Sequence, residues 1–195
     1  MYYKLDCAFP MADDNTYYDI EDGLQFDGIK SWALGHTFAK SPPNPIIVPI
    51  TKIGTSTDPI VVPSPFHDAF MCLATPDVVA AMKGCGVNSI DVYPAILQDT
   101  QTGVQFPYFA VNIIGIVKVA DLDESEWTNL DGEAKMDTIF ESLVIDSSRA
   151  RNWDIFRMYE DTGTILISER VKRALEHIPF ITFQPVPNSG EHTSP

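Results

Sequence analysis

Carboxylates are the side chains of this sequence that most readily suggest chemistry, because 27 Asp and Glu residues stand against 13 Lys and Arg residues. Asp13 with Asp14, and Asp121 with Asp123 and Glu124, carry the oxygen ligands that a hard cation such as Ca²⁺ prefers. Neither group lies in an Asp/Asn-Gly loop with EF-hand spacing, so solvated acidic loops are the favoured interpretation. The sequence therefore predicts no metal ion and no cofactor.

Nucleophiles and bases show no catalytic spacing. The sequence lacks the motifs GxSxG, GxxxxGK(S/T) and GxGxxG, so it offers no preset oxyanion hole and no nest of amides for a phosphate. No CxxC pair and no HExxH spacing occurs among the cysteines and histidines, which are Cys7, Cys72, Cys85, His36, His67, His177 and His192. We therefore expect reduced, structural thiols and no catalytic residue.

Two further positions bear on catalysis. His67 and Asp68 are chain neighbours, and neighbours do not face one another in a helix or a strand, so a catalytic dyad is not expected. Arg157, between Phe156 and Met158, is the charge expected to be half-buried, as the anchor of an ion pair with a carboxylate. An enzyme with an unrecognised site is the alternative, and it would need a pocket with converging carboxylates of perturbed pKa near His67 or His177.

The net charge of −14 is concentrated in two segments. Residues 1–27 hold seven acids against one base, a net charge of −6, and residues 121–146 hold nine acids against one base, a net charge of −8. Nucleic acid and anionic membrane are poor partners for such a surface. A basic protein partner is the natural inference, and solvated loops that only keep the protein soluble are the alternative. The candidate contact residues are Asp13, Asp14, Asp19, Glu21, Asp22, Asp121, Asp123, Glu124, Glu126, Trp127, Asp131 and Glu133.

The size and the composition favour one globular domain. At 195 residues, 45% of them apolar, the chain can bury a sizeable core. Apolar runs such as AVNIIGIVKVA are too short for a membrane helix, which needs about 20 residues. The opening residues MYYKLDCAFPMADD lack the basic and apolar regions of a secretory signal, so we expect a cytoplasmic protein.

Two stretches share one order of predicted elements. CLATPDVVAAMKGCGVNSIDVYPAI and ILISERVKRALEHIPFITFQPV each predict a strand, a cap, a short helix and a strand that ends near Pro. Thr75 before Pro76, and Ser168, are the expected N-caps. Matching apolar stripes are formed by Val78, Ala81, Met82 and Cys85, and by Val171, Ala174, Leu175 and Ile178. The sequence predicts a strand-rich α+β fold with two related strand-helix-strand units packed in one globular domain.

The remaining segments complete this single domain over residues 1–195. We expect an irregular part at 1–70, the first unit at 71–97, middle strands with an acidic excursion at 104–164, the second unit at 165–187 and a flexible tail at 188–195. SPPNPIIVPITK predicts an extended edge segment, because proline cannot donate to a sheet ladder. FAVNIIGIVKVADL predicts a long strand with a possible bulge at Gly115, in which Asn112 must find hydrogen-bond partners if it is buried.

The second unit carries a resemblance. ILISERVKRALEHIPFITFQPV, preceded by DIFRMYEDTG, resembles the C-terminal signature of the immunity protein eleven family of bacterial polymorphic toxin systems. The matching residues are Phe156, Arg157, Ser168, Glu169, Arg170, Val171, Lys172, Pro185 and Val186. With Asn112 and Leu175, these positions mark the strand-cap-helix framework rather than a contact surface. The resemblance is weak before Pro45, and the first unit departs from it with Thr75-Pro76-Asp77 where Ser-Glu-Arg is expected.

This resemblance implies a non-enzymatic protein that binds and neutralises a cognate toxin domain in the cytoplasm of the producing cell. Many such toxins end in nuclease domains, which need a cationic cleft for their substrate, and local acidic segments suit an inhibitor that covers such a cleft. The acidic candidates and Trp127 would then be the toxin-binding residues. An enzyme with an unrecognised site and a non-catalytic scaffold protein are the alternatives.

Overall fold

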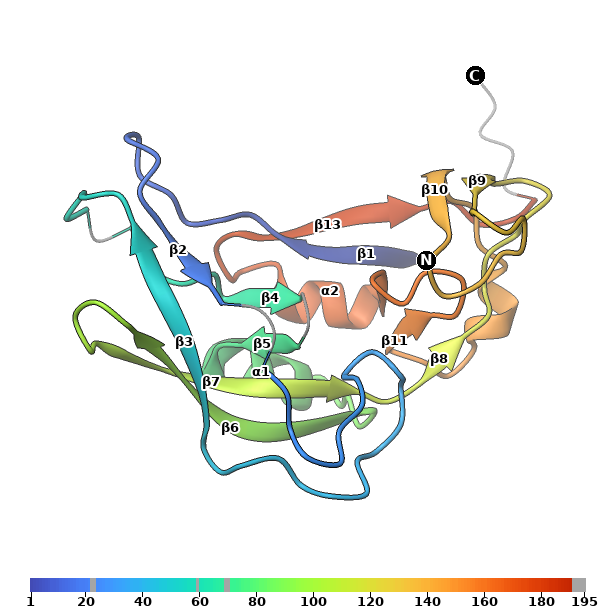
Figure 1. The fold of residues 1–195 in the computed structure, drawn as a ribbon. Coiled ribbons are helices and arrows are strands. Elements are labelled where there is room, and N and C mark those ends of the chain that lie inside the picture. The colour runs from blue at the N-terminus through green and yellow to red at the C-terminus, as the bar shows by residue number, and fades with distance from the viewer. Residues whose placement is uncertain (22–23, 59, 69–70, 191–195) are drawn as a thin grey trace.

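The computed structural model describes residues 1–21, 24–58, 60–68 and 71–190 (Figure 1). Over these residues the fold is α+β and mostly β, with two sheets, a short two-stranded ribbon and two helices. In the part of the chain that the structure describes, neither helix has the length and apolar character that a membrane-crossing helix needs.

A six-stranded sheet has the order β2-β3-β6-β7-β5-β4. Its strands are β2 (Tyr17–Ile20), β3 (Ile46–Ile53), β4 (Phe66–Asp68), β5 (Cys72–Ala74), β6 (Ile90–Asp99) and β7 (Gln105–Ile113). β5 and β6 both run antiparallel to β7, which lies between them. Helix α1 (Pro76–Gly84) joins β5 to β6.

A five-stranded sheet has the order β13-β1-β12-β11-β8. Its strands are β1 (Tyr2–Cys7), β8 (Ile116–Val117), β11 (Ile155–Met158), β12 (Ile165–Ser168) and β13 (Ile181–Val186). β12 and β13 both run antiparallel to β1, which lies between them, and helix α2 (Glu169–Leu175) joins β12 to β13. The separate ribbon pairs β9 (Glu126–Thr128) with β10 (Ile139–Ser142), and a 3₁₀ turn, η1, spans Ser147–Ala150.

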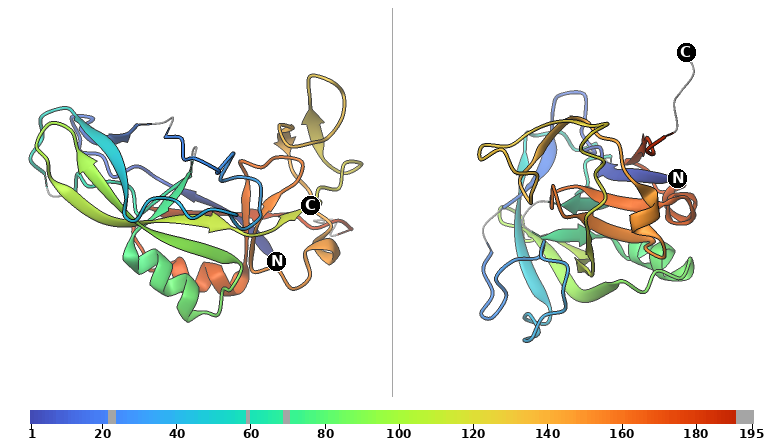
Figure 2. Two further views of the ribbon diagram at one scale, coloured as in Figure 1. Left: turned by 60° about the horizontal axis from the view of Figure 1, so that its bottom comes forward. Right: turned by 90° about the vertical axis from the view of Figure 1, so that its right-hand side faces the viewer.

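The two helices lie side by side and share one core with both sheets (Figure 2). Val78 and Met82 of α1 and Val171 and Leu175 of α2 are fully buried there, so the predicted apolar stripes face the core. Thr75 and Ser168 hold the N-cap positions, but neither hydroxyl bonds to a helix amide. The Ser168 hydroxyl instead donates to the Asp154 carboxylate at 2.8 Å.

The chain crosses from one sheet to the other at Gly115. β7 ends at Ile113 and β8 begins at Ile116, so the long strand expected here is broken, and the expected bulge at Gly115 is a crossing instead. Gly115 has a φ of 116°, and a Cβ added to it would lie 2.4 Å from the Trp153 ring. The position therefore needs glycine for its backbone angle and for its contact with Trp153.

Pro49 and Pro94 lie inside strands, although proline lacks the amide that donates to a sheet ladder. The segment expected at a sheet edge is β3, which lies between β2 and β6, so the edge prediction was wrong. Pairing with β2 stops at Ile50, and the Pro49 carbonyl on that side accepts a bond from Glu21 N at 3.2 Å. Because N and O of a strand residue face the same side, the nitrogen of Pro49 faces Glu21 at the end of β2 and points away from β6. The missing amide therefore affects the ladder only where β2 ends, and the pairing of β3 with β6 is kept. The strand expected to end at Pro94 continues as β6 to Asp99.

Residues 1–70, expected to be irregular, supply four strands to the two sheets. Both strands that pair with β1 come from the C-terminal part of the chain, so the sequence around β1 does not indicate its place in the sheet. The segment from 24 to 38 is a loop that covers the outer face of the six-stranded sheet with an aromatic cluster. Within it, the rings of Trp32 and Phe38 lie 4.8 Å apart.

Candidate functional site

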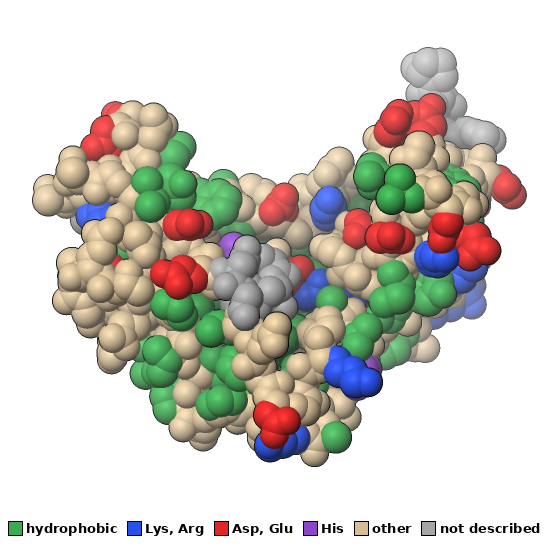
Figure 3. All heavy atoms as spheres, viewed as in Figure 1, with side chains coloured by type: hydrophobic (Ala, Val, Ile, Leu, Met, Phe, Trp, Pro, Cys, Tyr) green, Lys and Arg blue, Asp and Glu red, His purple; other side chains and the backbone are tan. Residues whose placement is uncertain are grey.

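The two acidic segments stand at opposite ends of one face of the molecule. The chain between β1 and β2 rises at one end, the β9–β10 ribbon rises at the other, and β1 and β13 lie between them (Figure 1). Asp and Glu side chains gather on both raised ends, and the surface between them is hollowed (Figure 3). The predicted contact residues therefore form two separate acidic surfaces that flank a shared hollow.

The first surface is the smaller. Asp13 and Asp14 are exposed in the turn between β1 and β2, where the Asp14 carboxylate accepts a bond from Thr16 N at 3.1 Å. Asp19 is exposed in β2, and Glu21 is exposed just after this strand. Asp22 lies outside the described residues.

In the second surface, some carboxylates fold the chain and others face solvent. Asp121 accepts bonds from the amides of Asp123 and Glu124 at 3.1 and 3.2 Å, and from the Ser189 hydroxyl at 2.7 Å. The Ser189 hydroxyl and these amides hold the pKa of the Asp121 carboxyl below its usual value. Asp121 therefore stabilises its own turn. Asp123, Glu124 and Glu126 are exposed. Trp127 is half-buried, and its indole nitrogen donates to the Leu122 carbonyl at 3.3 Å.

The connection from β9 to β10 is held in shape by its own polar groups. The Asn129 amide donates to the Asp137 carboxylate at 2.9 Å, and the hydroxyl of the buried Thr138 accepts from Lys135 N at 2.9 Å. Asp131 and Glu133 both pair with the Lys135 ammonium, and this pairing lowers the pKa of Asp131. Thr138 N donates to the Glu160 carbonyl at 2.9 Å, which fixes the connection to the end of β11.

Two apolar side chains stand out from this acidic surface. Leu130 is fully exposed and Ile139 is 67% exposed. Sequence reasoning missed both, because an apolar residue in a sequence gives no sign of whether the folded chain covers it. Together with the carboxylates they give the ribbon a mixed surface, apolar at some points and acidic around them.

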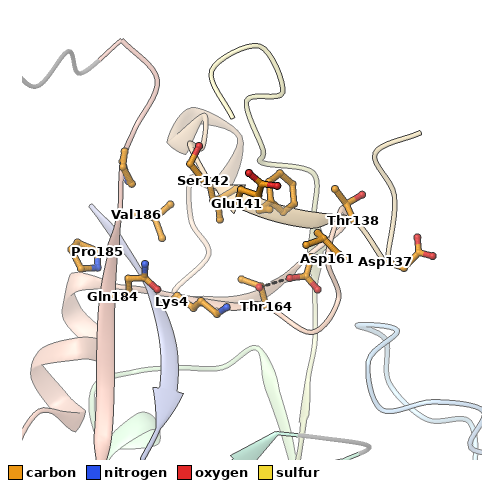
Figure 4. Close-up of a pocket in the computed structure, with 14 residues that line it drawn as sticks. Lys4, Asp137, Thr138, Glu141, Ser142, Asp161, Thr164, Gln184, Pro185 and Val186 are labelled. Atoms are coloured by element: carbon orange, nitrogen blue, oxygen red, sulfur yellow. Dashed lines mark hydrogen bonds between the residues drawn. The ribbon is translucent and has the colours of Figure 1, made fainter. Parts of the chain in front are cut away.

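A groove of about 660 Å³ runs beneath β10. Glu141 and Ser142 of β10 lie on one side, and Lys4, Gln184 and Thr164 lie on the other (Figure 4). The Asp161 carboxylate accepts a bond from the Thr164 hydroxyl at 2.5 Å. The five residues from 139 to 143 all line the groove.

The cavities near the two histidines do not bring free carboxylates together. A cavity of about 300 Å³ near His67 is lined by Asp6 and Asp68, but Arg157 holds both oxygens of Asp68, at 2.6 and 2.9 Å. A groove of about 440 Å³ near His177 has one carboxylate, Asp77, among its described lining residues. The arrangement that the enzyme alternative requires is therefore missing at both described cavities.

Arg157 is more deeply buried than expected. Its side chain is 2% exposed, and besides Asp68 it donates to the Thr162 carbonyl at 2.8 Å. Because Arg157 lies in β11 and Asp68 in β4, the ion pair links the two sheets. The expectation of an ion-pair anchor is confirmed, and sequence reasoning had not identified Asp68 as its partner.

The other motif residues also serve the framework. The Asn112 side chain is buried and donates to the His36 carbonyl at 2.9 Å, which pins the covering loop. Phe156, Val171 and Leu175 are fully buried, and Pro185 pairs with Tyr3 in the edge strand β13.

Within the described residues, no group of three or more His, Cys, Asp or Glu side chains is placed to hold a metal ion. The three cysteines are free thiols, and Cys72 is fully buried, which raises its pKa well above the usual value. A comparison with protein-family models finds no match to this chain, and a search of curated proteins finds none either.

Proposed function

We propose that this protein is a non-catalytic immunity protein that binds and neutralises a cognate toxin domain with a basic surface, a nuclease-type domain in the first instance. The observation that carries the proposal is the placement of the net −8 segment on a raised, self-supported ribbon that also exposes aliphatic side chains. Exposed aliphatic side chains among charged groups match the mixed composition of a protein interface. The C-terminal resemblance supplies the class of partner.

The fit to a nuclease domain rests on charge. A nuclease binds a polyanion through a cationic cleft, and two acidic surfaces on either side of a hollow complement a basic protein surface seated between them. In this proposal the protein acts in the cytoplasm of the producing cell, where it blocks the active site of the toxin domain before substrate can enter.

We further propose that the two strand-helix-strand segments are related units. In each, two parallel strands joined by a helix flank one antiparallel strand, which is β7 in one sheet and β1 in the other. The matching apolar stripes of α1 and α2 support the same relation. On this view the repeated framework is the scaffold, and recognition belongs to the segments outside it.

The direct test is co-expression with the C-terminal domain of a large toxin encoded beside this protein, followed by affinity pull-down at low and high salt. A stoichiometric complex that restores growth, and that associates more slowly at high salt, would support the proposal. Charge reversal at Asp123 and Glu124 should slow association more than it speeds dissociation. Absence of both complex and rescue would leave the enzyme and scaffold alternatives.

A further inference from the structure

The most exposed aliphatic side chains stand in the most acidic segment. Leu130 is fully exposed and Ile139 is 67% exposed, whereas no other large hydrophobic side chain of the described residues except Met1 exceeds 55%. Scattered apolar residues are normal on protein surfaces, but Leu130 and Ile139 both fall within one ribbon and its connection. The exposure of these two side chains is a property of the folded chain, and it is independent of the negative charge of the segment.

The connection that carries Leu130 is ordered before any partner arrives. Its backbone amides are bonded on both sides of the tip: Asp131 N donates to the Asn129 side chain at 3.2 Å, and Lys135 N donates to the Thr138 hydroxyl at 2.9 Å. Thr138, itself buried, bonds to the Glu160 carbonyl and joins the connection to the body of the protein. A backbone held in this way loses little conformational entropy when the side chain that it carries enters a pocket.

The surroundings indicate what kind of pocket would accept it. Asp131, Glu133, Asp137 and Glu141 are all exposed in the same ribbon and connection as these aliphatic side chains. Protein interfaces commonly place an apolar anchor at the centre and charged groups at the rim. A complementary partner would therefore offer an apolar pocket bordered by Lys or Arg side chains.

We propose that Leu130 and Ile139 are the anchor residues of the contact with the basic partner, and that the surrounding carboxylates steer the encounter. This inference rests on the proposed function and assigns its binding energy to two residues. Desolvation of the aliphatic side chains stabilises the formed complex and sets its dissociation rate. The carboxylates act at long range and set the association rate.

The experiment measures association and dissociation rates of the toxin domain with the wild-type protein and three variants. Leu130→Ser and Ile139→Ser should each raise the dissociation rate roughly 10- to 100-fold, since each removes most of one buried aliphatic side chain. Their association rates should stay within about 3-fold of the wild type. Val104→Ser is the matched control, because Val104 is 48% exposed beside the β6–β7 hairpin and lies outside both acidic segments.

A second measurement needs no partner. Hydrogen exchange of the free protein should show protection at the amides of Asp131, Lys135 and Thr138, because all three are bonded within the connection or to the body. Exchange at the rate of an unstructured peptide would overturn the proposal that the anchor is presented in a fixed conformation.

The outcomes separate the two proposals. If the toxin domain binds and both serine variants dissociate as slowly as the wild type, the anchor inference fails while the immunity function stands. If the wild type does not bind, the proposed function fails and takes the inference with it. If the free protein is a dimer in sedimentation and Leu130→Ser makes it a monomer, the anchor serves a second copy of this chain, which also overturns the inference.

Discussion

Removing Asp68 should test the ion pair that joins the two sheets. The Arg157 guanidinium donates two bonds to Asp68 and one to the Thr162 carbonyl, and it is 2% exposed. In Asp68→Ala this cation would stay buried with one neutral acceptor. Breaking such a pair by removing one partner costs about 3–5 kcal/mol. Because Asp68 is 12% exposed, water can reach part of the site, and we expect about 3 kcal/mol.

Urea unfolding followed by the fluorescence of the three tryptophans measures this loss. For a slope of about 2–3 kcal/mol per molar urea, the midpoint of Asp68→Ala should fall by roughly 1 M or more. The double variant Asp68→Leu/Arg157→Met should recover most of the stability, since apolar residues of similar volume often replace a buried pair without loss. Lys40→Ala is the control, because its ion pair with Asp27 is exposed and should contribute less than about 1 kcal/mol. If Asp68→Ala behaves like this control, the two sheets are not held together by the pair.

Three further predictions concern single sites. Gly115→Ala should lower the free energy of unfolding by about 2 kcal/mol or more in thermal or urea unfolding, because the added methyl meets the Trp153 ring at a φ of 116°. Asp99→Ala should cost about 1–3 kcal/mol at pH 7, since the buried carboxylate accepts bonds from Gln101 N and the Thr102 hydroxyl. The hydrogen bond from the Thr102 hydroxyl is the main cause that lowers the pKa of Asp99. The stability that the Asp99 carboxylate contributes is therefore present above the ordinary pKa of a carboxyl group. The difference in free energy of unfolding between wild type and Asp99→Ala should shrink as pH falls through the lowered pKa of Asp99. Burial raises the pKa of the Glu160 carboxyl, so the wild type should lose stability as pH rises through that pKa. Glu160→Gln should therefore be more stable than the wild type at pH 7, and its free energy of unfolding should change less between pH 4 and 7.

Local order was predictable where the signal was local. The strand, cap position and helix around Thr75 and Ser168 were correct, because turn chemistry and a 3.6-residue apolar stripe act within a few residues. The edge assignment of β3 failed because a proline within a strand does not exclude pairing on both sides of that strand. Pro49 lies where the neighbouring strand has ended, and only the tertiary pairing shows this.

Long-range features could not be obtained from the sequence. The burial of Arg157 was anticipated, but Asp68 lies 89 residues away and nothing local distinguishes it from the other carboxylates. The exposure of Leu130 and Ile139 was missed for a related reason. A hydrophobicity pattern does not show whether the folded chain covers a particular apolar side chain. The acidic residues, by contrast, are visible in composition, but whether each folds a turn, as Asp121 does, or faces solvent depends on the fold.

The position of β1 between β12 and β13 has a consequence for biosynthesis. Tyr2–Cys7 leaves the ribosome long before either of its neighbours, which both lie within residues 165–186. At about 5–20 residues per second, the strand waits roughly 10 to 30 s without either partner, with the side chains of Tyr3 and Leu5 still uncovered. The five-stranded sheet can therefore form fully only after translation has passed Val186. Until then, chaperones or rapid translation must keep β1 of the nascent chain from pairing with another strand.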